Sequence, residues 1–196
     1  MEVPGDAGDA LYIARWKERI MKAYVLNEPG GVENLVLSEI EKPAIKADEV
    51  LVETKAISIN PVDVKVRPVG EFLTRILGTK DRPVILGWDI SGTVVAVGKE
   101  VRGFEFGDKV FGMVNFPGHG KAYAEYVASP ASHLAVMPGK VTFEKAAATT
   151  LAALTGLHQG GSTRLIRHTC NSRMCSLTRP LGFPRANKHL DICLFF

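Results

Sequence analysis

EVLVETKAISINPVD, residues 49–63, sets the architecture of this chain. Apolar and polar residues alternate along residues 49–59, which is typical of a strand with one buried face. Asn60 is a strong N-cap, Pro61 suits the first position of a helix, and Asp63 is the acidic third residue of a capping box. The segment therefore predicts a half-buried strand that leads directly into a helix. The two faces of the strand carry Val50, Val52 and Ala56 on one side and Glu49, Glu53 and Lys55 on the other.

On both sides of this segment the chain alternates between short apolar runs and turns rich in glycine and proline. The turns include Pro29-Gly30-Gly31, Gly98 and Gly107-Asp108. Many short strands separated by such turns favour a barrel over a layered α/β sheet. We therefore predict a mostly β fold, a partly open barrel, with one long helix. Further strands are predicted over residues 21–26, 35–40, 91–97, 109–113, 122–127 and 133–136.

The long helix is predicted over residues 143–159. Thr142 is a good N-cap, Glu144 suits the positive end of the helix dipole, and residues 146–157 have high helix propensity. The surface of this helix is apolar nearly all round. We therefore expect it to be buried against another part of a molecule.

Charge and cysteine content divide the chain into three parts. Residues 1–20 form an extension with no packing pattern, and residues 21–159 form the domain that holds the strands and the helix. Residues 160–196 carry six Lys/Arg against one Asp, together with all three cysteines. We expect this last part to be a basic, disordered tail.

The same composition excludes several classes of protein. The net charge of +3 is small, and the dispersed basic residues of the tail match no nucleic-acid-binding signature, so no nucleic-acid partner is expected. No run of about 20 apolar residues is present and residues 1–20 lack the apolar core of a signal peptide, so no membrane partner is expected. An odd number of cysteines, none of them in the main domain, argues for a reducing, cytoplasmic environment.

Seven blocks of sequence then occur in one order along the main domain. They are KAY (22–24), DEVLV (48–52), NPVDVK (60–65), PVILGWDISG (83–92), FGDKVFG (106–112), AYAEY (122–126), and AAA with LT in one helix (146–148 and 154–155). Together they resemble the catalytic domain of the medium-chain dehydrogenase/reductases, in the zinc-independent quinone oxidoreductase (zeta-crystallin-like) branch. The resemblance implies a GroES-like fold for residues 21–159. It also implies NADPH-dependent hydride transfer to a quinone, an enone or a related α,β-unsaturated carbonyl.

Zinc is not expected, although alcohol-dehydrogenase relatives use it. A catalytic zinc needs three protein ligands from Cys, His and Asp/Glu. Where zinc enzymes carry a loop cysteine, this chain has Asn60-Pro61-Val62-Asp63, and where they carry Gly-His-Glu it has Gly87-Trp88-Asp89. The spacing of the tail residues His168, Cys170, Cys175, His189 and Cys193 matches no zinc-finger pattern either.

Asn60 has two compatible interpretations. It can act only as the N-cap of the helix that begins at Pro61. The resemblance instead places its amide near the nicotinamide and the substrate, where the NH₂ group could polarise a quinone carbonyl. By this second interpretation Asn60 is both a catalytic and a cofactor-binding residue, whereas Asp63 serves mainly as a cap.

Thr155 also has two interpretations. Its hydroxyl can bond back into its own helix. The resemblance implies instead that it faces the nicotinamide ring, and we favour this cofactor-binding role. Phe72 is the nearest aromatic residue to the position where relatives often carry a tyrosine, so a hydroxyl donor is missing there.

The glycine-rich turn that holds a dinucleotide is the feature we do not find. Residues 160–163, Gly-Gly-Ser-Thr, follow a predicted helix rather than a strand, and they lack the third glycine of the dinucleotide-binding turn. The 37 residues from Gly160 to the last residue are also too few for a Rossmann domain. We therefore expect a truncated reductase with little or no activity. The alternative is a non-enzymatic interaction module or decoy that docks on a protein partner through helix 143–159.

Overall fold

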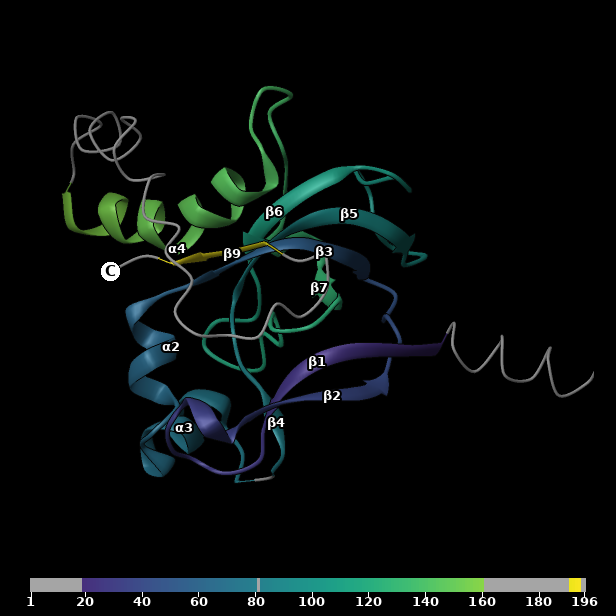
Figure 1. Cartoon of the computed structure of the whole chain (residues 1–196). Helices are drawn as coiled ribbons and strands as arrows, with labels where there is room; N and C mark the ends of the chain where they lie inside the picture. Colours follow the sequence, from purple (N-terminus) through teal and green to yellow (C-terminus); the bar gives the residue numbers. More distant parts are fainter. Residues whose placement is uncertain (1–18, 81, 161–190, 195–196) are drawn as a thin grey trace, which may run out of the picture.

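The computed structural model describes residues 19–80, 82–160 and 191–194, which form two sheets of mostly antiparallel strands and three α-helices (Figure 1). In the larger sheet the strands follow the order β7-β3-β5-β6-β8, and β9 pairs with β3 in parallel. In the smaller sheet the order is β2-β1-β4. The larger sheet holds β3 (Glu49–Ile59), β5 (Asp89–Val97), β6 (Lys109–Met113), β7 (Tyr126–Pro130), β8 (Ala135–Val136) and β9 (Asp191–Leu194); the smaller holds β1 (Ile20–Leu26), β2 (Leu35–Glu41) and β4 (Val84–Ile85).

The expectation of a mostly β, partly open architecture with one long helix is confirmed. The long helix is α4 (Phe143–Gly160), and two short helices, α2 (Pro61–Val66) and α3 (Gly70–Leu77), lie beside the smaller sheet (Figure 1). Two short 3-10 turns, Val32–Asn34 and Ala131–His133, precede β2 and β8. The two sheets do not close into a barrel.

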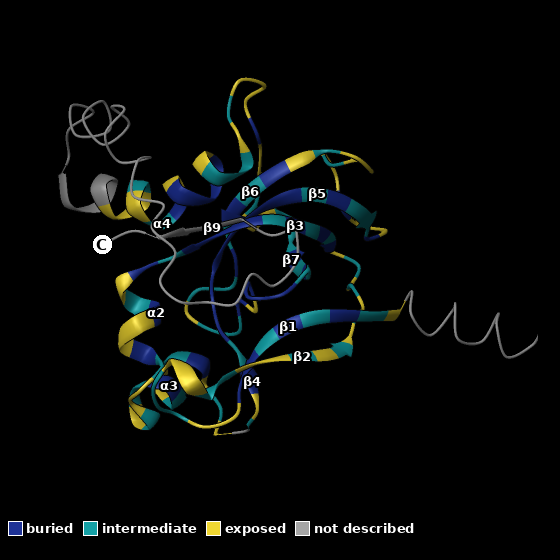
Figure 2. Ribbon diagram, in the orientation of Figure 1, coloured by how far each residue is buried: buried dark blue, intermediate teal, exposed yellow. Residues whose placement is uncertain are grey.

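The centre of the larger sheet is β3, which pairs with β5 along most of its length and with β7 at its first half. Its buried residues Val50 and Val52 belong to one core cluster with Ile90 and Val94 of β5 and Val110 of β6. Much of β3 and β5 is accordingly coloured as buried in Figure 2. A Cβ atom on Gly92 would collide with the carbonyl oxygen of Glu53 on β3, so the two strands approach closely only because this residue is glycine. This sheet forms the main hydrophobic core.

Glu49 does not lie on an exposed face, contrary to the alternation that the sequence suggests. Its side chain is buried because its carboxylate accepts the Lys46 backbone N–H at 2.9 Å and pairs with Lys46 Nζ at 3.4 Å. Two register shifts in the pairing of β3 with β5 also interrupt the strict alternation.

Residues 122–127 do not form one strand, which corrects the sequence-based expectation. The strand β7 begins only at Tyr126, and Ala124 makes an isolated bridge to Ala23 of β1. The backbone N–H of Tyr123 donates to Leu86 at 3.0 Å, while its carbonyl accepts from Tyr24 at 2.8 Å. This segment therefore crosses between the two sheets and pairs in turn with each of them.

Over the part of helix α4 whose side chains the structure describes, residues 143–155, the buried positions lie between Ala146 and Thr150. Residues Ala146–Ala148 are buried against β3, β5 and β6. The hydroxyl of Ser91 on β5 donates to the carbonyl of Phe143 at 2.6 Å, which fixes the start of the helix. Leu154 is 43% exposed, so the later turns carry apolar surface that the described residues do not cover.

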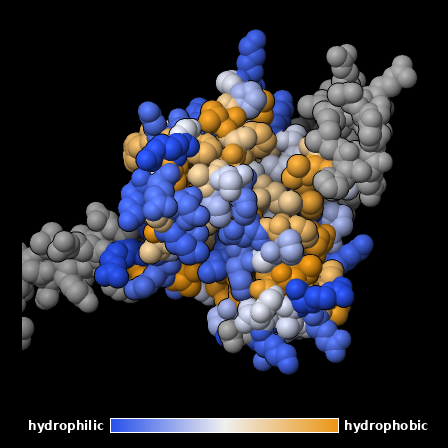
Figure 3. Space-filling view, turned by 180° about the vertical axis from the view of Figure 1, so that it is seen from behind, coloured by the Kyte–Doolittle hydropathy of each residue, from blue (hydrophilic) through white to orange (hydrophobic). Residues whose placement is uncertain are grey.

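The expected extension and tail lie almost entirely outside the described residues. Their described parts are Arg19 and Ile20, the second of which begins β1, and Asp191–Leu194, which forms β9. No described helix combines the length and the apolar character needed to cross a membrane. Apolar and polar side chains are intermixed on the face seen from behind (Figure 3).

Candidate functional site

A cluster of buried polar side chains lies where β3 ends and α2 begins. Asn60 follows the last residue of β3 and is only 4% exposed. The Asp63 carboxylate accepts the Asn60 backbone N–H at 2.8 Å, and the Asp63 N–H donates to the Asn60 carbonyl at 3.0 Å. These bonds confirm the capping role expected for Asp63, and they fix the main chain of Asn60.

The Asn60 side chain is held by a second carboxylate. Its Nδ2 atom donates to Oδ2 of Asp89 at 2.9 Å, and both residues are buried. The same Oδ2 atom accepts the backbone N–H of Leu151 in α4 at 3.2 Å. Asp89, the first residue of β5, therefore connects Asn60 to the long helix.

Sequence reasoning missed this role of Asp89 and treated the residue only as a replacement for a zinc ligand. Asp89 is 29 positions from Asn60 and 62 positions from Leu151, so no local pattern reveals the contacts. The only local signal is an acidic residue at the head of an apolar strand, because such a residue is seldom fully buried without partners.

Burial dominates the electrostatics of the cluster. It raises the pKa of Asp89 to about 6, although hydrogen bonds from Thr150, Asn60 and the Leu151 N–H act in the opposite direction. It likewise raises the pKa of Asp63 to about 6, against hydrogen bonds from the Asn60 backbone and from Tyr123, while the nearby Asp89 charge adds to the increase. The pKa of the buried Tyr123 hydroxyl is raised well above its ordinary value, first by burial and then by the Asp63 charge.

Thr155, the second residue expected at the site, lies apart from this cluster. It is exposed on α4, one turn beyond Leu151. No hydrogen bond joins it to Asn60 among the described residues; the link runs through Asp89 and the helix. The back-bonding considered for Thr155 is made instead by Thr149 and Thr150, whose hydroxyls donate to Ala146 and Ala147 at 2.9 and 3.0 Å.

The described residues contain no group of three His, Cys, Asp or Glu side chains placed to hold a metal ion. Trp88, which stands where zinc enzymes have a histidine, is buried and donates its indole N–H to the Gly118 carbonyl at 2.9 Å. The absence of zinc stays a prediction that rests on the chemistry of these side chains. The side chains of His168, Cys170, Cys175, His189 and Cys193 lie outside the described part.

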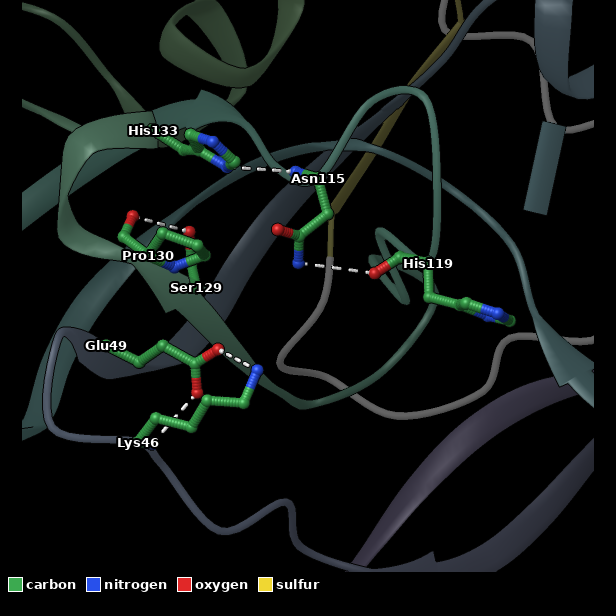
Figure 4. Close-up of polar contacts among 7 residues, drawn as sticks. All are labelled: Lys46, Glu49, Asn115, His119, Ser129, Pro130 and His133. Atoms are coloured by element: carbon green, nitrogen blue, oxygen red, sulfur yellow. Dashed lines mark hydrogen bonds and ion pairs between the residues drawn. The ribbon is translucent and has the colours of Figure 1, made fainter. Parts of the chain in front are cut away.

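A separate polar cleft of about 420 Å³ lies near the opposite end of β3, at Glu49 (Figure 4). Nδ1 of His133 accepts the backbone N–H of Asn115 at 3.1 Å, and the Asn115 amide donates to the His119 carbonyl at 3.3 Å. Lys46 and Asp48 complete much of its rim. The residues that line this cleft do not include Asn60, Asp63 or Asp89, so the cleft is distinct from the buried cluster.

Comparison with known proteins gives a consistent result. Residues 46–139 match the alcohol dehydrogenase GroES-like domain. A 2-methylene-furan-3-one reductase of Solanum lycopersicum is 36% identical over 150 residues, which cover 72% of this chain and 38% of that protein. A chloroplastic NADPH-dependent alkenal/one oxidoreductase of Arabidopsis thaliana is 38% identical over 141 residues, which cover 69% of this chain and 36% of that protein.

The same relationship holds for solved structures. The quinone oxidoreductase from Coxiella burnetii superimposes with a TM-score of 0.67 and 34% identity, over 71% of this chain and 44% of that one. The chain thus spans less than half the length of these relatives, and the matched part includes Asn60, Asp63 and Asp89.

Proposed function

The chain belongs to the quinone oxidoreductase branch of the medium-chain dehydrogenase/reductase superfamily, and we propose on this premise that its GroES-like domain forms the substrate side of an NADPH-dependent reductase. Its substrates are quinones or α,β-unsaturated carbonyls. The names of the relatives support both the cofactor and the substrate class. The single observation that carries the proposal is the buried, oriented amide of Asn60.

Asn60 supplies the polarising group. An asparagine amide has two N–H donors, and Asp89 uses one of them at 2.9 Å. The second N–H donates to the substrate carbonyl oxygen, on which negative charge grows during reduction. A buried, preorganised donor stabilises such charge more strongly than a donor in water.

NADPH fits a site whose polar group is the Asn60 amide. Hydride transfer to a quinone or an α,β-unsaturated carbonyl needs the protein to orient and polarise the substrate, and it needs no acid or metal ligand from the protein. NADPH supplies the hydride when it is bound. Asn60 would orient the acceptor, and Thr155, which is exposed on α4, would lie on the nicotinamide side. The domain works without zinc because Asn60 and Trp88 occupy two positions where zinc enzymes carry ligands, and neither is a zinc ligand in proteins.

We also propose that these 196 residues alone have little or no reductase activity. Gly160, the described residue of the only glycine-rich candidate, ends α4 instead of opening a helix after a strand. The test is NADPH oxidation by the purified chain with duroquinone as acceptor, together with calorimetry of NADPH binding. No turnover and no micromolar binding are expected, whereas turnover at the rates of full-length relatives would contradict this proposal.

A second candidate function, docking on a protein partner through helix 143–159, is favoured by one observation. Leu154 is 43% exposed on the later turns of α4. The other exposed apolar residues are scattered over several elements, among them Val36, Val64 and Phe106. Light scattering distinguishes the two functions, because a monodisperse monomer that stays soluble at high concentration counts against a docking helix.

A further inference from the structure

We propose that Asp89 is a positioning residue that holds the Asn60 amide and helix α4 in one fixed arrangement. The importance of that arrangement for reduction rests on the function proposed above, but the arrangement itself does not. One carboxylate oxygen, Oδ2, accepts both the Asn60 amide at 2.9 Å and the Leu151 N–H at 3.2 Å. The amide and the helix therefore share one acceptor, which strand β5 carries.

The main chain of Asn60 is fixed independently of its side chain. Asp63 binds the Asn60 backbone N–H, so the position of the residue does not depend on Asp89. The orientation of the amide depends on two contacts, because the capping box holds its oxygen at the Asp63 backbone N–H while Asp89 accepts from Nδ2. Loss of Asp89 therefore leaves Nδ2 without its partner while the main chain of the residue stays in place.

Few side chains anchor the buried face of helix α4. Ala146–Ala148 are small and face the sheet, and Thr150, which is also buried, makes a further hydrogen bond with Asp89. Strand β5 holds the helix at two points, through Ser91 to Phe143 and through Asp89 to Leu151. These points are eight residues apart, about 12 Å along the helix axis, so together they fix its rotation as well as its start.

Thr155 depends on the same contact. It lies one helical turn beyond Leu151, so the rotation that Asp89 fixes also sets the direction in which Thr155 projects. A single buried acid thereby relates the two residues of the proposed site, which do not touch each other.

The burial of an acid at this place supports a positioning role. Asp89 has no exposed surface, and its raised pKa shows that the ionised form is disfavoured by burial. Two titratable groups, Asp63 and Tyr123, lie near Asp89. The Thr150 hydroxyl of α4 hydrogen-bonds with Asp89, and the charge of Arg67 acts on Tyr123. An apolar residue would fill this space without that penalty, but it could not accept two hydrogen bonds.

The test is nuclear magnetic resonance of the ¹⁵N-labelled chain with three variants. In Asp89→Ala, we expect the Asn60 side-chain amide signals to move toward the values of a mobile amide, and the Leu151 amide to exchange with solvent at least about tenfold faster. In Asp89→Asn, the new amide oxygen replaces Oδ2, so both signals should return close to their wild-type behaviour. In the matched control Asp108→Ala, which removes an acceptor for the Glu105 N–H in an exposed turn, neither should change.

Unchanged Asn60 and Leu151 signals in folded Asp89→Ala would overturn the proposal. If Asp89→Ala fails to fold, hydrogen exchange in the wild-type chain decides the question. The Asn60 side-chain amide and the Leu151 amide should both be protected from solvent, and exchange of either at the rate of a mobile amide would overturn the proposal.

The failure of this inference and that of the proposed function are distinguishable. An Asn60 amide that is freed in Asp89→Ala, but that does not respond to duroquinone in the wild type, leaves the positioning role intact and contradicts the reductase role. An Asn60 amide that responds to duroquinone, but is unaffected by Asp89→Ala, leads to the opposite conclusion.

Discussion

Gly92 of β5 lies directly against the carbonyl oxygen of Glu53 on β3, at a separation that no side chain can enter. The contact lies at the centre of the larger sheet, in a region where the register of the β3–β5 pair shifts between Thr54 and Ala56. Close approach of these two strands brings Asp89, three residues before Gly92, to the Asn60 amide at the end of β3. The geometry of the candidate site therefore depends on a glycine that is not part of it.

We predict that Gly92→Ala lowers the free energy of unfolding by about 2–3 kcal/mol, because the added methyl group collides with backbone rather than with a flexible side chain. Urea denaturation measures the change. The control is Gly139→Ala, where no atom lies within 4 Å of the new methyl group and a change within about 0.5 kcal/mol is expected. Equal effects of the two substitutions would show that the strands have room to separate.

The pH dependence of stability should report the two buried carboxyl groups. The pKa values of Asp63 and Asp89 are raised from 3.8 to about 6, so the folded state holds these protons more tightly than the unfolded state does. The corresponding stability is present at low pH and is lost as the pH rises through about 6. Between pH 7 and pH 5 each carboxyl group should therefore add about 1 kcal/mol to stability.

Asp63→Asn and Asp89→Asn provide the measurement for this effect. Urea denaturation at pH 5 and at pH 7 should show that each variant loses part of the gain that the wild type makes at the lower pH. A wild type whose stability falls more steeply than that of both variants between pH 7 and pH 5 would contradict the direction of the pKa shifts.

Ser91→Ala tests the contact at the start of α4. The Ser91 hydroxyl donates to the Phe143 carbonyl at 2.6 Å across 52 residues, and its loss should reduce the free energy of unfolding by about 1 kcal/mol. Ser38→Ala is the matched control, since the Ser38 hydroxyl makes only a long, exposed bond to Val36 at 3.4 Å. If both substitutions have the same effect, the Ser91 bond does not anchor the helix.

Local patterns predicted the elements that depend on local signals. The strands β3 and β6 begin and end as expected, because alternation and turn residues mark their ends. The start of α2 follows from Asn60, Pro61 and Asp63. Helix α3 was missed, because its N-cap is Val69 and its first residue is Gly70, neither of which signals a helix.

The candidate site could be predicted only in part, for the same reason. Asn60 was identified through a resemblance and through its capping position, both of which are visible in one short segment. Its partner Asp89 becomes evident only when β3 and β5 pair, and Leu151 only when α4 docks on them. The extent to which this chain covers α4 has a related origin, because an apolar surface does not tell which turns the rest of the chain will cover.

A titration of the ¹⁵N-labelled chain with duroquinone, observed at the side-chain amides, tests most directly whether Asn60 receives the substrate. We predict that the Asn60 Nδ2 signals shift and saturate. The Nδ2 signals of Asn34, an amide in the turn before β2 that donates to the Glu28 carbonyl, should stay in place as an internal control. An Asn60 signal that remains fixed up to the solubility limit of duroquinone would contradict the claim that this amide receives the substrate carbonyl.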